Sequence, residues 1–195
     1  IKNTDEEVAK QQQIADKVFE NLIPRSSHQA IEFTTSGAGE PFASAMIMSM
    51  LQRLSLDKLP NLRLNLHTNG LLAPSKWHQI KHIESAVRII TVSVDAATAA
   101  TYEQVRRGGK WQSLIEAMDF LKHKKHQLGF EFRTRMIFQQ RNYLEAKAFY
   151  DFSQNFNVDR VEYSRLNNWH SWPKDQFQQH DVLHLSHAER SEEHT

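Results

Sequence analysis

Residues that could bind a ligand gather in this sequence at the ends of its short apolar segments. The first such stretch runs from Ser36 to Pro41 and reads SGAGEP, with an acid and a proline after two glycines. Glycine lets a backbone approach a ligand closely, and successive amide groups can form a concavity for a charged group. The stretch is therefore either a plain turn between a strand and a helix or one wall of a binding site.

Polar residues follow two later apolar runs in comparable places. Thr68-Asn69-Gly70 ends one run, and Ser93 and Asp95 end another. Asp95 either contributes to a binding site or caps the helix that follows it, a role for which Thr98 competes. These residue types donate and accept hydrogen bonds, which suits a small polar ligand.

Arginines add a possible anion-binding function. Arg133 and Arg135 lie in one apolar run. A guanidinium group holds a carboxylate through two parallel hydrogen bonds, so the pair could bind a ligand, or it could form ion pairs with Glu32 or Glu162. Arg106 is either a solvated cation at a helix end or a further binding residue.

A regular alternation of helices and strands must position these residues. Apolar residues recur with helical spacing in six segments and alternate with polar residues in five others. The expected helices are 5–22, 42–54, 74–84, 98–106, 110–127 and 142–156, and the expected strands are 29–36, 62–70, 88–96, 129–137 and 159–166. This alternation favours parallel strands joined by right-handed helical crossovers in one domain.

Each expected strand has one polar face, which decides between two kinds of parallel sheet. In an open sheet with helices on both faces, charged side chains would be buried without partners at high cost. In a barrel the helices lie outside and the polar face lines the interior. The sequence therefore predicts an α/β fold, a partial (βα)6 TIM-like barrel of parallel strands with its first strand missing. Its interior would contain Glu32, Arg63, His67, Asp95, Arg133, Arg135 and Glu162.

Composition excludes several classes of protein. The 195 residues carry a formal net charge of +1 and contain no long apolar run, so we expect no nucleic-acid partner, no membrane partner and a cytoplasmic location. The absence of cysteine removes disulfides, thiolate catalysis and thiolate metal sites within these residues. His78 and His82 have the spacing of a metal pair but no third ligand, so no metal site is expected.

The strand ends, in this order, resemble the radical S-adenosylmethionine (SAM) superfamily over roughly residues 5–170. SGAGEP is similar to the Gly-Gly-Glu-Pro motif of that superfamily, with Ala38 replacing the first glycine, and LHTNG is similar to the end of its third strand. VSVDAATAATYEQVRRGGKWQSLIEAMDFL resembles the fourth strand and its helix in the branch that often carries a SPASM or twitch extension. FQQRNYLEAKAFYDFSQNFNVDRVEYSRLNNW is similar to the fifth and sixth units.

This resemblance implies an enzyme that cleaves SAM reductively to a 5′-deoxyadenosyl radical, which abstracts hydrogen from a substrate. It implies two cofactors, SAM and a 4Fe–4S cluster, and two partners, an unknown substrate and an external electron donor. By resemblance, the SAM-binding residues are Gly37, Ala38, Gly39, Glu40, Pro41, Asn69, Ser93, Asp95, Arg135 and Leu166. No catalytic residue follows from it.

The chain departs from the family because it lacks the CxxxCxxC loop that binds the cluster after the first strand. Helix 5–22 resembles the helix after that loop, so we expect the loop and the first strand to precede Ile1 and the chain as given to be inactive. We expect residues 1–189 to be a core fragment. Residues 190–195, RSEEHT, translate the start of a common sequencing-library adapter, and we expect them to be an artefact.

Two other functions stay open. A relative that never binds a cluster would be a non-catalytic binding module. Another (βα)-barrel enzyme could use Glu32, His67 and Asp95 for acid–base catalysis. A complete reading frame without a three-cysteine loop would exclude the radical enzyme.

Overall fold

Five parallel strands form the sheet of this protein. A computed structural model describes residues 5–22, 29–35, 39–168 and 173–183. The strands are β1 (Ile31–Thr35), β2 (Leu62–Thr68), β3 (Val87–Ser93), β4 (Glu131–Phe138) and β5 (Arg160–Arg165). Each neighbouring pair is parallel, as the alternation of helices and strands predicts.

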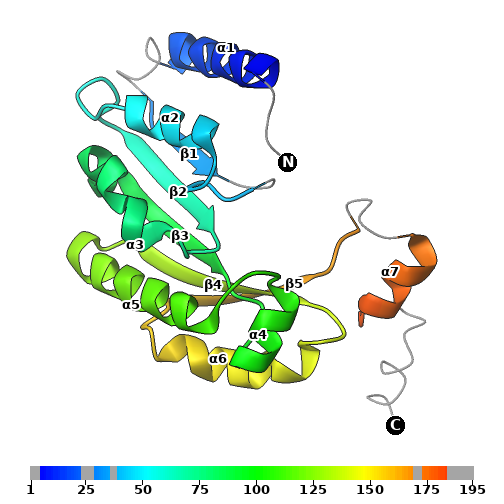
Figure 1. Cartoon of the computed structure of the whole chain (residues 1–195). Coiled ribbons are helices and arrows are strands. Elements are labelled where there is room, and N and C mark those ends of the chain that lie inside the picture. The colour runs from blue at the N-terminus through cyan, green and yellow to red at the C-terminus, as the bar shows by residue number, and fades with distance from the viewer. Residues whose placement is uncertain (1–4, 23–28, 36–38, 169–172, 184–195) are drawn as a thin grey trace.

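The order of the strands across the sheet identifies the kind of fold. It follows the chain without a reversal, β1-β2-β3-β4-β5. A doubly wound sheet reverses its strand order at a switch point, whereas right-handed crossovers that always advance place their helices on one side. Figure 1 shows the helices that connect the strands following the outer side of a curved sheet. The predicted α/β fold, consistent with a partial TIM-like barrel, is confirmed.

Helices connect the strands and flank the sheet. The α-helices are α1 (Asp5–Leu22), α2 (Ala45–Arg53), α3 (Ala73–Lys76), α4 (Ala99–Val105), α5 (Trp111–Leu128), α6 (Ala146–Gln154) and α7 (Lys174–His180), and the 3-10 helices are η2 (Trp77–Ala86) and η3 (Tyr143–Glu145). The helix predicted over 42–54 begins only at Ala45, because the Ser44 hydroxyl accepts the amide of Ile47 and caps it. Within the described ranges, no helix combines the length and the apolar character needed to cross a membrane.

The helix predicted over 74–84 is mostly a 3-10 helix. Its buried residues Trp77, Ile80, Ile83 and Ala86 recur at every third position. A period of three matches the three residues per turn of a 3-10 helix, so this winding keeps all four on one face. The indole N–H of Trp77 also donates to Glu84 Oε2 at 2.6 Å. The prediction of a helix is confirmed, and the structure adds that most of it is a 3-10 helix.

The two faces of the sheet differ as the sequence predicts. Buried and partly exposed side chains alternate along β2 and β4. Leu64, Ile90 and Phe132 belong to a core that is continuous with the residues of the helices. The helices therefore cover the apolar face, and the polar face points away from them.

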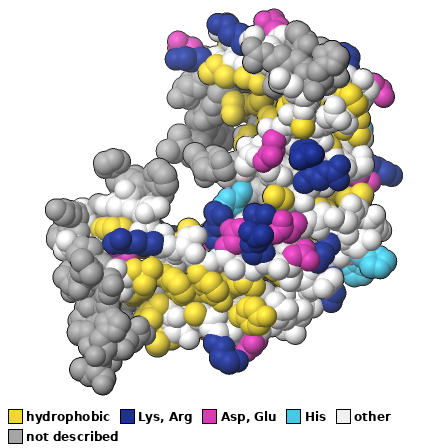
Figure 2. Space-filling model, turned by 180° about the vertical axis from the view of Figure 1, so that it is seen from behind, with side chains coloured by type: hydrophobic (Ala, Val, Ile, Leu, Met, Phe, Trp, Pro, Cys, Tyr) yellow, Lys and Arg dark blue, Asp and Glu magenta, His cyan; other side chains and the backbone are white. Residues whose placement is uncertain are grey.

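Ion pairs cross the polar face between β4 and β5. Arg133 pairs with Glu131 at 2.7 Å and with Glu162 at 3.3 Å, and Arg135 pairs with Glu162 at 2.6 Å. Arg160 continues the row at 3.1 Å from Glu131. Figure 2, seen from behind, shows basic and acidic side chains alternating in such a cluster. On this part of the face, three arginines thus share two glutamates in a connected row of ion pairs.

Candidate functional site

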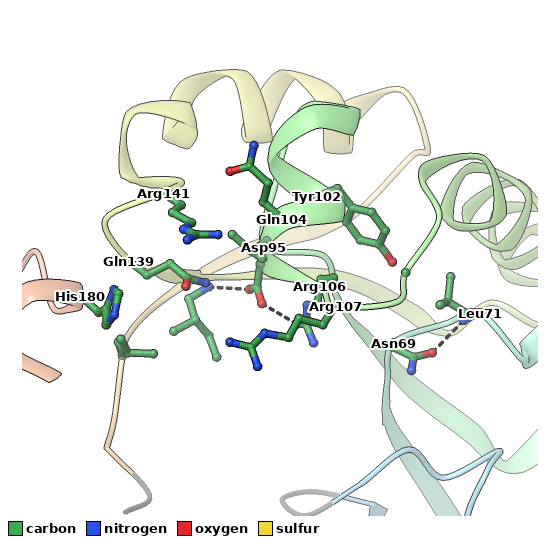
Figure 3. A pocket seen from close by; sticks show the side chains of 14 residues that line it. Asn69, Leu71, Asp95, Tyr102, Gln104, Arg106, Arg107, Gln139, Arg141 and His180 are labelled. Carbon is green, nitrogen blue, oxygen red and sulfur yellow. Dashed lines mark hydrogen bonds and ion pairs between the residues drawn. The ribbon is translucent and has the colours of Figure 1, made fainter. Parts of the chain in front are cut away.

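A pocket of about 710 Å³ opens at the carboxyl ends of the strands (Figure 3). Its wall includes Asn69 after β2, Asp95 after β3, Ile137 near the end of β4 and Leu166 after β5. The remaining wall comes from Leu71 in the turn after β2, from α4, from the turns after α4 and β4, and from α7. Ligands of parallel α/β folds bind at this end of the sheet, and small-molecule sites usually measure about 300–1,000 Å³.

The pocket brings together part of the predicted site. Asn69, Asp95 and Leu166 line it, although they come from three different strand ends. Gly37 and Ala38 lie outside the described residues. The other five predicted positions, Gly39, Glu40, Pro41, Ser93 and Arg135, are not among its lining residues. That any of the ten contacts a ligand stays a prediction.

Asp95 is held from several directions in the pocket wall. Its Oδ1 accepts the backbone N–H of Ile137 at 2.7 Å, and its Oδ2 lies 2.6 Å from Nη2 of Arg106. The side-chain amide of Asn142 donates to the Asp95 carbonyl at 2.9 Å. Asp95 also has a φ of 63°, a left-handed conformation that is costly for a residue with a Cβ. These contacts fix the loop after β3 against the loop after β4.

The electrostatic balance at Asp95 has two opposed causes. Burial raises the pKa of this carboxyl, while the charge of Arg106 and the N–H of Ile137 act to lower it. The alternative that Asp95 caps the next helix is wrong, because the hydroxyl of Thr98 accepts the amide of Thr101 and caps α4. The structure instead pairs the Asp95 carboxylate with Arg106.

Arg106 is a structural partner of Asp95 and is only partly satisfied by it. Its side chain is 29% exposed, so it is not the freely solvated cation that one alternative held. Its Nε is buried and has no acceptor among the described residues. The turn that follows Arg106 is closed by a hydrogen bond to its backbone and depends on a glycine. Gly109 donates to the Arg106 carbonyl at 2.8 Å, and a Cβ on Gly109 would lie 2.9 Å from the ring of Tyr102.

Glu40 connects the turn after β1 to the end of β2. Its Oε2 accepts the backbone N–H of Asn69 at 2.6 Å, and its Oε1 accepts the Thr68 hydroxyl at 2.5 Å and the N–H of Phe42 at 3.2 Å. Gly39 before it has a φ of 111°, which favours glycine. Pro41 is buried in the turn that precedes the capped helix α2. The carboxylate of Glu40 therefore positions two strand ends.

Ser93 and Arg135 lie on the polar face, where they are register partners in β3 and β4. The Ser93 hydroxyl is 2.7 Å from Nε2 of His67. Burial and the nearby charge of Arg135 lower the pKa of His67. Arg135 forms its ion pair with Glu162, one of the two partners that the sequence left open. The other carboxylate, Glu32, accepts instead from the side-chain amide of Asn65.

Sequence reasoning missed several residues of the pocket. Arg107 and Arg141 line it, and Asn142 fixes the Asp95 loop. The glycines at 108 and 109 marked a tight turn and so could have directed attention to the arginines before them. No local signal marked Asn142, because its partner Asp95 is 47 positions away.

Metal ligands do not gather anywhere in the described residues. No group of three or more histidine, cysteine, aspartate or glutamate side chains there could hold a metal ion. His82, one of the two histidines with helical spacing, has its Nε2 at 3.1 Å from the carbonyl oxygen of Leu54.

Comparison with known proteins finds similarity both by sequence and by structure. No protein-family model matches this sequence. The chain is 33% identical over 106 residues to the GTP 3′,8-cyclase of Pelotomaculum thermopropionicum. This match covers 52% of the chain and 31% of the cyclase, so the chain spans about a third of that protein's length.

One similar solved structure is that of a radical SAM methyltransferase from Sphaerobacter thermophilus. The TM-score is 0.50 with 14% sequence identity, over 78% of this chain and 46% of the other. At this identity the likeness shows a shared fold. The printed names of both similar proteins are those of enzymes.

Proposed function

We propose that this chain is the SAM-binding part of a radical SAM enzyme of the branch with a SPASM or twitch extension. The pocket carries the proposal, because Asn69, Asp95 and Leu166 were expected at a SAM site from three separate strand ends and line one cavity. When bound and reduced by one electron, SAM would supply a 5′-deoxyadenosyl radical for hydrogen abstraction from a substrate.

The residues present fit the nucleoside part of SAM. Asp95 can accept hydrogen bonds from ribose hydroxyls, because each carboxylate oxygen has a second lone pair beyond the bonds it already makes. Leu166 offers an apolar side chain on which adenine can pack, and Asn69 offers a side-chain amide. Glu40 would act indirectly, because its carboxylate holds the backbone of Asn69 in place.

The residues present do not fit an iron–sulfur cluster. Such clusters are held by cysteine thiolates, and the chain contains no cysteine. We therefore propose that the chain as given binds SAM without cleaving it. The ligands of the cluster, the electron donor and the substrate contacts of the intact enzyme would come from outside these residues.

Calorimetric titration of SAM into the purified chain tests the proposal. We expect saturable binding with a dissociation constant on the order of micromolar, about −8 kcal/mol. Leu166→Glu would place a second carboxylate in the apolar part of the pocket and should weaken binding by at least about tenfold. The matched control is Leu144→Glu, because Leu144 is 82% exposed on η3 and does not line the pocket.

Two outcomes would reject the proposal. One is a chain with the circular dichroism of a folded α/β protein and no heat of SAM binding. The other is equal binding of SAM by the Leu166→Glu and Leu144→Glu variants, because it would place the ligand elsewhere.

A non-catalytic binding module is the second candidate, favoured by the absence of cysteine from all 195 residues. The third candidate, acid–base catalysis by Glu32, His67 and Asp95, has less support. Within the described residues these three side chains have separate partners, namely Asn65, Ser93 and Arg106. Reconstitution of the intact protein with iron under anaerobic conditions separates the first two: a cluster absorption band with SAM cleavage identifies the enzyme.

A further inference from the structure

Arginines outnumber acids in the wall of the pocket. Arg106, Arg107 and Arg141 line it together with one carboxylate, that of Asp95. Figure 3 shows that Arg106 and Arg107 come from the end of α4, whereas Arg141 comes from the turn after β4. We call these three residues the arginine set. With Asp95 ionised, they leave an excess of two positive charges at the pocket.

The arginine set makes few ion pairs or hydrogen bonds with the described residues of the protein. Arg107 and Arg141 are exposed and form no ion pair or hydrogen bond with any described residue. Arg106 is paired through Nη2 only, and its buried Nε has no acceptor in the part of the chain that the structure describes. A buried guanidinium N–H without an acceptor is uncommon in native proteins, and a ligand oxygen would satisfy it.

Neighbouring carboxylates do not balance the set. Glu145 does not line the pocket, and its carboxylate faces the hydroxyls of Thr98 and Thr101 and the amide of Ala97. Asp181 beside the pocket pairs with Arg165 at 2.7 Å. The excess positive charge therefore faces the open volume of the pocket.

SAM alone does not account for this charge. It is a cation at neutral pH, because its sulfonium and ammonium charges outnumber its one carboxylate. One arginine could pair with that carboxylate, but a pocket for SAM only would gain nothing from the remaining surplus charge, since like charges repel. A phosphate monoester carries about −1.5 to −2 at pH 7, which matches the excess of the arginine set.

We propose that the arginine set binds a phosphate group of the substrate next to SAM, so that the enzyme acts on a phosphorylated small molecule. This inference rests on the proposed function for the presence of SAM. Arg107 and Arg141 would approach the phosphate from opposite sides, and Arg106 Nε would donate to one of its oxygens. The cationic SAM and the anionic substrate would then stabilise each other in the pocket.

One rival explanation makes the opposite prediction. If the arginine set holds the carboxylate of SAM itself, an added phosphate must compete with SAM. The sign of the coupling between SAM and a phosphate probe therefore separates the two.

The experiment is calorimetric titration of SAM into the chain with and without saturating inorganic pyrophosphate at constant ionic strength. We expect pyrophosphate to tighten SAM binding by roughly fivefold or more, a usual size for coupled ligands. In the double variant Arg107→Gln/Arg141→Gln this gain should disappear. The matched control is Arg88→Gln, which removes an exposed arginine from the amino end of β3 and should keep the full gain.

Each outcome separates the two proposals. Weaker SAM binding in pyrophosphate, or SAM binding that pyrophosphate leaves unchanged, overturns the inference and leaves the proposed function intact. A gain of equal size in the double variant also overturns it. If pyrophosphate binds through Arg107 and Arg141 while SAM does not bind, the proposed function fails and the anion-binding role of the arginine set is confirmed.

Discussion

Two strand ends of this protein use a carboxylate in the same way and differ in what surrounds it. Glu40, after β1, accepts the backbone N–H of Asn69 at the end of β2. Asp95, after β3, accepts the backbone N–H of Ile137 near the end of β4. Each acid thus joins its own loop to the end of the next strand. A carboxylate at a strand end is therefore first a structural connection.

The second oxygen of each carboxylate makes the difference. That of Glu40 accepts a neutral hydroxyl and an amide, from Thr68 and Phe42. That of Asp95 pairs with Arg106 and brings a guanidinium into the pocket wall. The turn after β1 was recognisable from its sequence because its backbone demands a glycine. The pocket at β3 became visible only when the fold had assembled its side chains.

Asp95→Asn should give the largest effect and tests whether the β3 end depends on its charge. Asparagine tolerates the left-handed conformation of position 95 and can still accept the N–H of Ile137, so the variant removes mainly the ion pair. Because Arg106 would be left mostly buried without a counter-charge, we expect a loss of about 3 kcal/mol in the free energy of unfolding. Urea denaturation monitored by circular dichroism measures it.

A second substitution shows whether the charge is the cause. Arg106→Met in the Asp95→Asn background removes the unpaired cation and should restore part of the lost stability. No recovery in the double variant would mean that the loss comes from the Asp95 loop itself and not from the ion pair.

Glu40→Gln tests the other strand end, where we expect a smaller loss of about 2 kcal/mol. In the variant the acceptor of the Asn69 backbone N–H is no longer charged. The new NH2 group also faces one of the three donors that the Glu40 carboxylate accepts from, so that a donor meets a donor. The same denaturation experiment measures the loss, with Glu116→Gln on the exposed face of α5 as its control. If Glu40→Gln lowered the free energy of unfolding as much as Asp95→Asn, the ion pair at Asp95 would not distinguish the two strand ends.

Gly39→Ala tests the backbone requirement that made this turn recognisable. Alanine at a φ of 111° should cost about 1–2 kcal/mol, although nothing lies within 4 Å of the new Cβ. Gly129→Ala is the matched control, because it also has free space and a φ of 73°, closer to the region that other residues reach. Equal losses at both positions would show that the conformation of Gly39 carries no special constraint.

Local patterns predicted most of the fold, and distant contacts account for what they missed. Alternating polarity gave the five strands and their polar face, because each strand carries its own period in its own residues. The period of three at Trp77 was also present in the sequence, but the prediction named only a helix and not its kind.

The candidate site was harder to predict because its contacts join residues that are far apart in the chain. Asp95 and Ile137 are separated by 42 positions, and Asp95 and Asn142 by 47. Whether Arg135 would face a ligand or Glu162 depends on the register of β4 and β5, which no residue spacing reveals. Arg107 and Arg141 reach one pocket only because two turns after different elements meet there.

The His67 prediction concerns the smallest expected effect on stability. His67 lies on the polar face, and Arg106 of the pocket wall is among the charges that act on it. Its ring contacts Ser93, and the charges that act on it are those of Arg135, Glu162 and Arg106. Burial and the two arginines lower its folded pKa below 6.5, against the opposing effect of Glu162.

The unfolded chain therefore binds more protons in the pH range just below 6.5. Stability should be fully present above that pH and should fall as the pH drops from 6.5 through the lower folded pKa. Urea denaturation at several pH values from neutral to mildly acidic should show this slope in the parent chain and a shallower one in His67→Gln. Parallel slopes would mean that His67 does not titrate differently on folding.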